Sequence, residues 1–209
     1  SGSDVGADIT VESLTGNGVL TVRHSGGTTF TNGVAASTVT LTDTTGAVSF
    51  LGNTTISSLV TASQGYGVSF LGLINNVAGD TTFANTGLIT LGNDGVGTDT
   101  ITFGGGLDTS TRAASSTSIG GRVVTTNTQM DLGAVSLTAT SELDSGTAAA
   151  SIINIGAVAG AGEGLTLDSG SDVGADITVE SLTGNGVLTV RHSGGTTFTN
   201  GVAASTVTL

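Results

Sequence analysis

The most specific chemical signal in the sequence is an acidic, glycine-rich segment at residues 94–101. It reads Asp-Gly-Val-Gly-Thr-Asp-Thr-Ile and fits the calcium-binding pattern G-G-x-G-x-D-x-U, except that Asp94 replaces the first glycine. Tandem copies of that pattern supply carbonyl and carboxylate oxygens to calcium. Asp94 and Asp99 are therefore the candidate metal ligands, and calcium is the only cofactor candidate. The motif has no tandem copy beside it, and a looser version at residues 4–9 recurs only at residues 172–177. An Asp-Gly turn at a corner of the fold is the simpler interpretation.

No set of catalytic residues accompanies this motif. The histidine His24, with its copy His192, stands beside Arg23 and has no carboxylate or cysteine near it in the sequence. A polar surface residue is the expected interpretation. No G-x-S-x-G turn precedes a helix, and the few arginines do not suit a polysaccharide-cleaving cleft. We therefore expect no catalytic residue and no enzyme activity.

The composition excludes several further kinds of site and partner. The 209 residues include 35 glycines but no cysteine, proline or tryptophan, and only 10% are charged. Without cysteine, the chain has no disulfide, thiolate metal site or cysteine nucleophile. A formal net charge of −12 argues against nucleic acid or an anionic membrane surface as a partner. No apolar stretch reaches the length of about 18 residues that a membrane span needs.

The chain contains a long internal repeat. Residues 1–41 and residues 169–209 are the same string, letter for letter, so that Ser1 corresponds to Ser169 and Leu41 to Leu209. We interpret residues 1–209 as one continuous structure, with residues 1–168 as a full repeat unit and residues 169–209 as the start of the next. This pattern predicts that the chain belongs to a longer array of such units.

A finer pattern indicates the fold class. An apolar residue, then Ser or Thr, then another apolar residue recurs nine times in one unit, bounded by Gly, Asn, Asp or Ser. This alternation is typical of short strands with one buried face. The triplets begin at Ile9, Leu20, Val39, Val48, Val68, Ile89, Ile101, Val135 and Leu165.

The last apolar residue of successive triplets recurs at a nearly constant interval. One column, with nearly equal steps along the chain, contains Val11, Phe30, Phe50, Phe70 and Leu91. A second column is predicted at Val22, Leu41, Leu59, Phe83 and Phe103. We expect these columns to form the structural core. Their regular return predicts an all-β, right-handed parallel β-solenoid (β-helix) with about 20–21 residues per coil.

The first column sets the expected length of the unit. Its continuation through Leu132 and Ile153 to Val179 gives about eight coils per unit, a rise of roughly 38 Å. An antiparallel sandwich or barrel is the competing fold, but its strands would not need this regular recurrence. Residues 104–129 fit the rhythm least well and are interpreted as a coil with longer corners, the alternative being a protrusion that makes lateral contacts.

Two phrases carry a resemblance to a known class of proteins. The segments GAVSFLGNTTISSLVTAS at residues 46–63 and YGVSFLGLINN at residues 66–76 resemble giant bacterial β-strand-repeat surface proteins. Those are similar to filamentous-haemagglutinin-type adhesins and autotransporter passenger regions. The resemblance covers the whole chain through composition and rhythm, and it implies secretion, cell-surface attachment or fibre formation.

We therefore expect a structural repeat module of a long extracellular or cell-surface fibre, stalk or filament that continues head to tail. The expected partners are identical repeat units or copies of the chain, placed end to end or laterally. The alternative is an adhesin repeat that binds cell-surface glycan or calcium.

Overall fold

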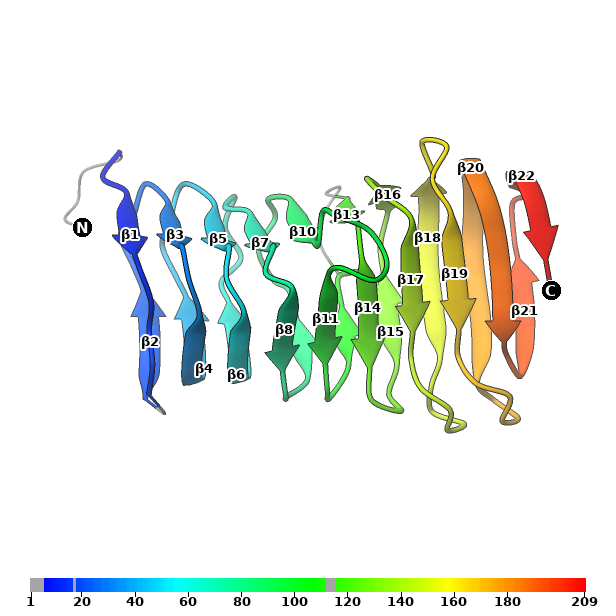
Figure 1. Ribbon diagram of the computed structural model, residues 1–209, viewed down its shortest axis with the longest axis horizontal. Coiled ribbons are helices and arrows are strands. Elements are labelled where there is room, and N and C mark those ends of the chain that lie inside the picture. Colours follow the sequence, from blue (N-terminus) through cyan, green and yellow to red (C-terminus); the bar gives the residue numbers. More distant parts are fainter. Residues whose placement is uncertain (1–5, 17, 112–115) are drawn as a thin grey trace.

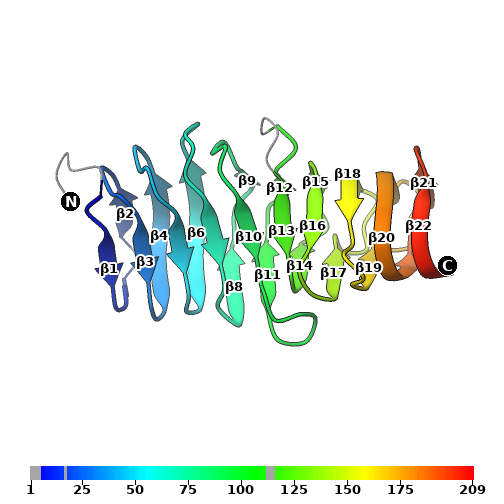
Figure 2. The same cartoon turned by 90° about the horizontal axis from the view of Figure 1, so that it is seen from above.

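The computed structural model describes residues 6–16, 18–111 and 116–209. Its strands follow one another along the long axis of the molecule, with the first and the last strand, β1 and β22, at opposite ends (Figures 1 and 2). The predicted all-β fold is confirmed as a parallel β-solenoid of about nine turns with about 21 residues per turn. None of the described residues forms a helix long and apolar enough to cross a membrane.

Each turn has three faces, and each face forms a parallel ladder of strands along the axis. The first ladder contains β1 (Ile9–Val11), β3 (Thr28–Phe30), β5 (Val48–Phe50), β7 (Val68–Phe70), β10 (Ile89–Leu91), β13 (Thr117–Ile119) and β16 (Val135–Leu137). The second contains β8 (Ile74–Val77), β11 (Thr100–Phe103), β14 (Arg122–Thr125), β17 (Ser141–Asp144) and β19 (Leu165–Asp168). The third contains β2 (Val19–Val22), β9 (Thr81–Thr82), β12 (Leu107–Asp108), β15 (Met130–Leu132) and β21 (Gly195–Phe198).

Longer strands pass from one face to the next. The strands that do so are β4 (Val34–Leu41), β6 (Thr54–Thr61), β18 (Ile153–Ala159), β20 (Asp176–His192) and β22 (Val202–Thr208). Because each turn of the chain is hydrogen-bonded to the turns before and after it, only the two end turns have one neighbour instead of two.

The core is filled by equivalent residues stacked on successive turns. Phe30, Phe50 and Phe70 are at most 1% exposed, and their rings stack at centroid distances of 5.0 and 4.9 Å. Phe103 meets the edge of Phe70 at 6.2 Å, and Phe83 meets Phe103 at 6.0 Å. β-branched and Leu side chains occupy most of the remaining inward positions, so the thin interior is closely packed.

The first column follows the first ladder as far as Leu91. Val11, Phe30, Phe50, Phe70 and Leu91 are successive Cα partners, and all but Val11, which is half-buried on the first turn, are buried. The predicted continuation of this column beyond Leu91 was wrong.

Beyond Leu91 the first ladder passes through Ile119 and Leu137, whereas Leu132, Ile153 and Val179 lie on the third. Ile89 pairs with Thr117, a longer step along the chain than the one from Val68 to Ile89, because the connection between these two turns is longer. Residues 104–129 contribute to all three ladders, as expected for a coil with longer corners. Residues 112–115 of that stretch lie outside the described part.

The predicted second column was also wrong as a single column. Val22 and Leu41 are partners on the third ladder, whereas Phe103 pairs with Val77 on the second. Phe83 follows β9 on the third ladder. All five residues predicted for this column are nevertheless buried. The recurrence of the apolar triplets indicates the length of a turn but not the number of its faces. The predicted second column therefore combined residues that belong to two different ladders.

The two identical segments occupy different faces of the solenoid. Ile9 begins the first ladder, but its copy Ile177 lies on the third, paired with Ile153. Leu14 is bridged to Val34 on the second ladder, but its copy Leu182 lies on the first. One unit therefore spans seven turns and two of the three faces of an eighth, and each unit is turned by one face relative to the unit before it.

Candidate functional site

The acidic turn at residues 94–99 is held together from inside by Asp99. This residue is fully buried, and its Oδ2 accepts hydrogen bonds from the main-chain N–H groups of Asn93 (2.8 Å) and Asp94 (3.2 Å). Gly95 and Gly97 have φ angles of 93° and 98°, which residues with a Cβ rarely adopt. Asp99 Oδ1 has no hydrogen-bond partner among the described residues. One oxygen of the Asp99 carboxylate, Oδ2, is therefore already bound to main-chain N–H groups of the turn itself.

The structure does not bring the two predicted ligands into a larger group of metal-binding side chains. Asp94 is exposed, while Asp99 points into the turn. Within the described ranges, no three His, Cys, Asp or Glu side chains are grouped so that they could hold a metal ion. The looser version of the motif begins at Asp4, outside the described residues, and in its copy Asp172 is exposed. Calcium binding stays a prediction.

A cluster of charged side chains lies where the first unit meets the second, and we call it the junction cluster. It contains Arg122, Glu142, Asp144, Asp168, Arg191 and His192. These residues stand on four successive turns of the second ladder or at its end: Arg122 is the Cα partner of Glu142, and Asp168 is the partner of both Asp144 and His192. The parallel register therefore stacks the charges along the axis.

Glu142 is the centre of the junction cluster. Its side chain is only 9% exposed, and it accepts hydrogen bonds from Arg122 Nε (3.0 Å) and from both terminal nitrogens of Arg191 (3.3 Å each). Arg122 also pairs with Asp144. Burial acts to lower the pKa of Arg122, but the Glu142 hydrogen bond and the charges of Asp144 and Glu142 raise it above its ordinary value. The guanidinium thus stays charged between two carboxylates.

The second unit closes the junction cluster from the other side. Arg191 Nη1 lies 3.5 Å from Asp168 Oδ2, and His192 Nδ1 lies 3.1 Å from the same oxygen. Asp144 and Asp168 are neighbouring partners of like charge, so the two arginines offset a repulsion that the ladder would otherwise impose. Arg191 and His192 therefore reach back from the second unit to the unit before it.

The same histidine has a different carboxylate in the first copy. His24 Nδ1 lies 2.6 Å from Asp43 Oδ2, on the following turn. In the second copy, His192 contacts Asp168, on the preceding turn. In a chain of repeated units each such histidine would have a carboxylate on both sides, Asp168 before it and Asp43 after it.

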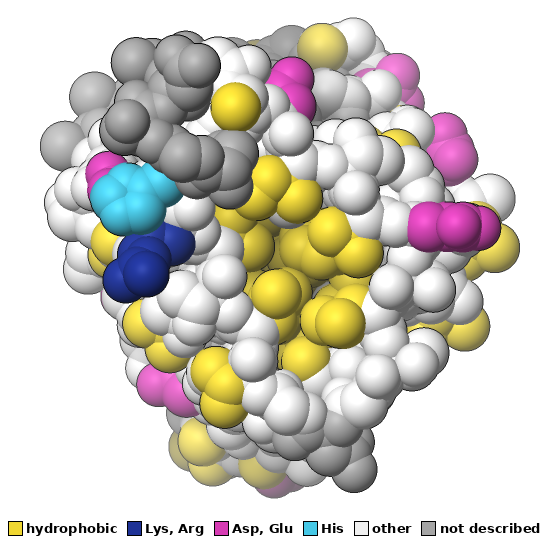
Figure 3. All heavy atoms as spheres, turned by 90° about the vertical axis from the view of Figure 1, so that its left-hand side faces the viewer, with side chains coloured by type: hydrophobic (Ala, Val, Ile, Leu, Met, Phe, Trp, Pro, Cys, Tyr) yellow, Lys and Arg dark blue, Asp and Glu magenta, His cyan; other side chains and the backbone are white. Residues whose placement is uncertain are grey.

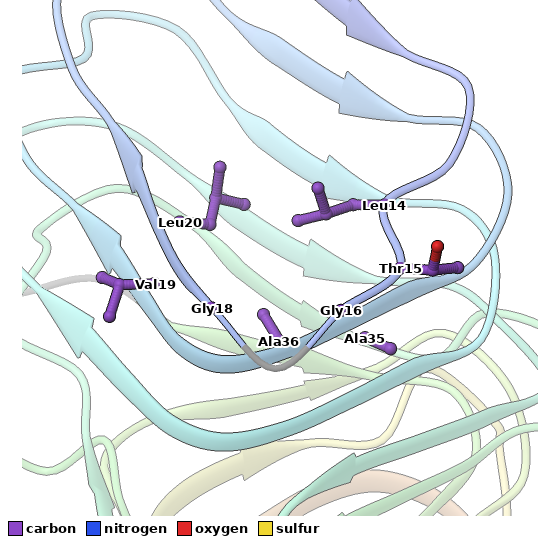
Figure 4. A pocket seen from close by; sticks show the side chains of 8 residues that line it. All are labelled: Leu14, Thr15, Gly16, Gly18, Val19, Leu20, Ala35 and Ala36. Atoms are coloured by element: carbon purple, nitrogen blue, oxygen red, sulfur yellow. The ribbon is translucent and has the colours of Figure 1, made fainter.

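The first turn leaves an apolar surface at the end of the solenoid. Figure 3 shows hydrophobic side chains gathered in the middle of this end. A cavity of about 170 Å³ opens there, with Leu14 and Leu20 on opposite sides and Ala35 and Ala36 of β4 contributed by the next turn (Figure 4). Leu14 and Leu20 are half-buried and pack against the core.

Sequence reasoning placed His24 and His192 on the surface but missed the junction cluster. Its members are far apart in the sequence, and nothing close to His192 in the chain suggested a partner. The signal that could have revealed part of it is the length of a turn: Arg122 and Glu142, which are Cα partners, lie one coil repeat apart in the sequence.

The chain was compared with family models, with curated proteins and with solved structures. No family model matches it, and no curated protein or solved structure matches it either. What can be stated is a β-solenoid fold, with no family or homologue identified.

Proposed function

We propose that the chain is a structural module of a long rod that is built by head-to-tail repetition of the unit at residues 1–168. The observation that carries this proposal is that the junction between units is built like the interior. Ile177, Leu182 and Leu188 of the second unit pair with Ile153, Val158 and Leu165 of the first, in continuous parallel ladders. The core passes through the junction without interruption.

The second copy also reproduces the internal register of the first. Ile9 pairs with Thr28, and their copies Ile177 and Thr196 pair with each other in the same way. Val19 pairs with Thr38, and its copy Val187 pairs with Thr206. The segment therefore folds in the same way at the start of a chain and after a complete unit, as a repeating module requires.

The physical basis of this role is a hydrogen-bonded ladder on each face, running along the axis of the rod. Continuous ladders resist bending, and equivalent apolar residues stacked on successive turns bury a continuous core. The net charge of −12 keeps neighbouring rods from collapsing onto one another. In this role the chain needs neither a catalytic residue nor a cofactor.

A position outside the cell, as a fibre, stalk or filament, is part of the proposal. It is supported by the resemblance of composition and rhythm to bacterial surface-protein repeats and by the shape of an extended rod. Immunogold labelling of the source cells with an antibody against residues 46–63 would test the location, and a signal confined to the cytoplasm would contradict it.

The rod itself is tested by chains that contain one, two and three units. Seven turns and two-thirds of an eighth, at about 4.8 Å per turn, give a rise of about 37 Å per unit. Electron microscopy should show rods that lengthen by this amount with each added unit, and thermal unfolding should shift upward. Particles whose length does not follow the number of units would contradict the proposal.

A further inference from the structure

The sequence contains a single Asn-x-Ser/Thr motif, which is the acceptor signal for an N-linked sugar. It reads Asn53-Thr54-Thr55, and no other asparagine of the 209 residues has serine or threonine two positions after it. The motif lies where the chain turns from β5 into β6, at a corner of an interior turn. Asn53 and Thr55 are exposed, while Thr54 between them is buried. Both side chains that the motif requires are therefore accessible on the folded rod.

The side-chain amide of Asn53 is held by its oxygen. The main-chain N–H of Ile74 donates to Asn53 Oδ1, with 3.1 Å between the two atoms. The main-chain carbonyl of Asn53 accepts from the N–H of Val34 at 2.9 Å. Asn53 Nδ2 makes no hydrogen bond within the described part of the chain. A sugar on Nδ2 would therefore leave the hydrogen bond from Ile74 in place.

The amide and the hydroxyl of the motif are presented on the same side of the coil. Asn53 and Thr55 both line a surface hollow of about 240 Å³, together with Gly33 and Ala35 of the preceding turn. Ala35 is the Cα partner of Thr55, and the residues in the hollow from that turn are small. Residues two apart in a strand point to the same face. An enzyme that needs to contact Asn53 and Thr55 together can thus approach both from one side.

Three exposed apolar side chains lie around this acceptor, and we call them the corner patch. Leu51 is 43% exposed, Leu73 is 58% exposed and Ile74 is 63% exposed. The two turns are in close contact here, because a Cβ on Gly72 would lie 2.8 Å from Asn53 N. Exposed apolar side chains that gather in one place on a protein surface commonly mark a place where something binds.

The corner patch also lies in the part of the rod that has no charge. The sequence contains no Asp, Glu, Lys or Arg from residue 44 to residue 79, although the chain as a whole has a net charge of −12. Charge therefore does not keep these turns solvated as it does elsewhere on the rod. A sugar at Asn53 would do so, because its C–H groups can cover apolar side chains while its hydroxyl groups face water.

We propose that Asn53 carries an N-linked sugar that covers the corner patch. This inference rests on the proposed position outside the cell. In the transfer, Asn53 Nδ2 forms a bond to the anomeric carbon of a sugar that is activated through phosphate on a nucleotide or lipid carrier. The bond from that carbon to the phosphate oxygen breaks, the phosphate leaves with the electron pair, and Nδ2 loses one proton. A transferase of the source cell catalyses the step, and this chain supplies the acceptor.

Mass spectrometry of the protein isolated from its source cells tests the site directly. Because the chain has no lysine, trypsin leaves Asn53 in one peptide with other asparagines, residues 24–112, and fragmentation of that peptide locates the sugar. The expected result is a sugar on Asn53 and none on Asn32. Asn32 is also exposed, at the same corner of the preceding turn, but the second residue after it is Val34. An unmodified Asn53 would overturn the proposal.

Variants of residues 1–209 test the motif and identify the donor. The folded chain is incubated with the soluble fraction of the source cells and nucleotide-linked sugars, or with the membrane fraction and lipid-linked sugars. Thr55→Ala should abolish the transfer in the active fraction, whereas Thr55→Ser keeps the motif and should retain it. Thr55 is exposed, so both variants should fold, which circular dichroism verifies. Equal transfer to the two variants would show that the motif is not the signal.

A second readout tests what the sugar covers. A dye that binds exposed apolar surface should give less fluorescence with the chain that carries the sugar than with the sugar-free chain. Leu73→Ser in the sugar-free chain should remove part of that difference. Equal fluorescence with and without the sugar would refute the covering of the corner patch. Rods found outside the cell with a sugar-free Asn53 would refute the modification and leave the proposed function standing, whereas a chain confined to the cytoplasm would refute the location on which both rest.

Discussion

Truncation of Phe30 and of its copy Phe198 provides the sharpest test of the stacked core. The two residues occupy the same place in the repeat, but Phe30 lies on an interior turn and Phe198 on the last complete turn. Phe30 is 1% exposed and stacks on Phe50 at 5.0 Å, with the two ring planes 5° apart. Phe198 is half-buried and is paired with Val179 on one side.

The expected losses follow from this difference in burial. Phe→Ala in a packed core costs about 3–5 kcal/mol, and loss of a stacked ring pair accounts for about 0.5–1.5 kcal/mol of the total. Phe30→Ala should therefore lower the free energy of unfolding by about 4 kcal/mol. Phe198→Ala leaves a cavity that is already open on one side, so its loss should be about 1–2 kcal/mol.

Urea unfolding followed by far-UV circular dichroism measures both losses, with an unchanged slope as the check that the same surface unfolds. Hydrogen exchange on the last turn shows whether Phe198→Ala frays that turn alone. Losses that agree within about 0.5 kcal/mol would refute the reasoning, because two residues of identical sequence context would then have the same environment.

Three further predictions concern single side chains. Tyr66, the sole tyrosine, is 1% exposed; its hydroxyl donates to the Leu41 carbonyl (2.9 Å) and accepts from the Ala62 N–H (2.8 Å), and burial raises its pKa above 10.0 despite that second bond. As the pH rises, the Tyr66 hydroxyl therefore loses its proton in the unfolded chain before it does so in the folded chain. The free energy of unfolding should fall as the pH rises above about 10, and Tyr66→Phe should remove that fall. An absorbance titration in which Tyr66 ionises at the same pH in folded and in urea-unfolded protein would contradict this. Glu142→Gln should lower stability by about 1–2 kcal/mol in urea unfolding at low salt, and no change would mean that the junction cluster is fully screened. Asp99→Ala should lower the melting temperature equally in calcium and in EDTA, because Asp99 binds main-chain N–H groups, and a loss seen only with calcium would establish a calcium site.

The part of the fold that could be predicted from the sequence is the part where turn length is constant. From Val11 to Leu91 the steps are nearly equal, so the first ladder could be followed by counting. The step from Ile89 to Thr117 is longer than those before it, and counting failed there. The corners of the coil carry no single sequence signal, since β4 passes from one face to the next while every residue before its final Leu41 is β-branched or small.

The candidate site was less predictable for a related reason. The Asp-Gly turn could be read as a motif because all its residues are close together in the chain. The contact between Arg122 and Glu142 depends on the register between two turns, and that between Arg191 and Asp168 depends on the register across the junction. Neither register can be assigned until the number of faces per turn is known.

Because each unit is turned by one face relative to the unit before it, equivalent side chains of successive units point to different sides of a long array. A side chain such as Asp94 would point to one side of the rod in the first unit, to a second side in the next and to the third side after that. The pattern would return to its first orientation after three units, about 110 Å along the axis. Such a rod has no front or back, so whatever it meets laterally can be met from every side.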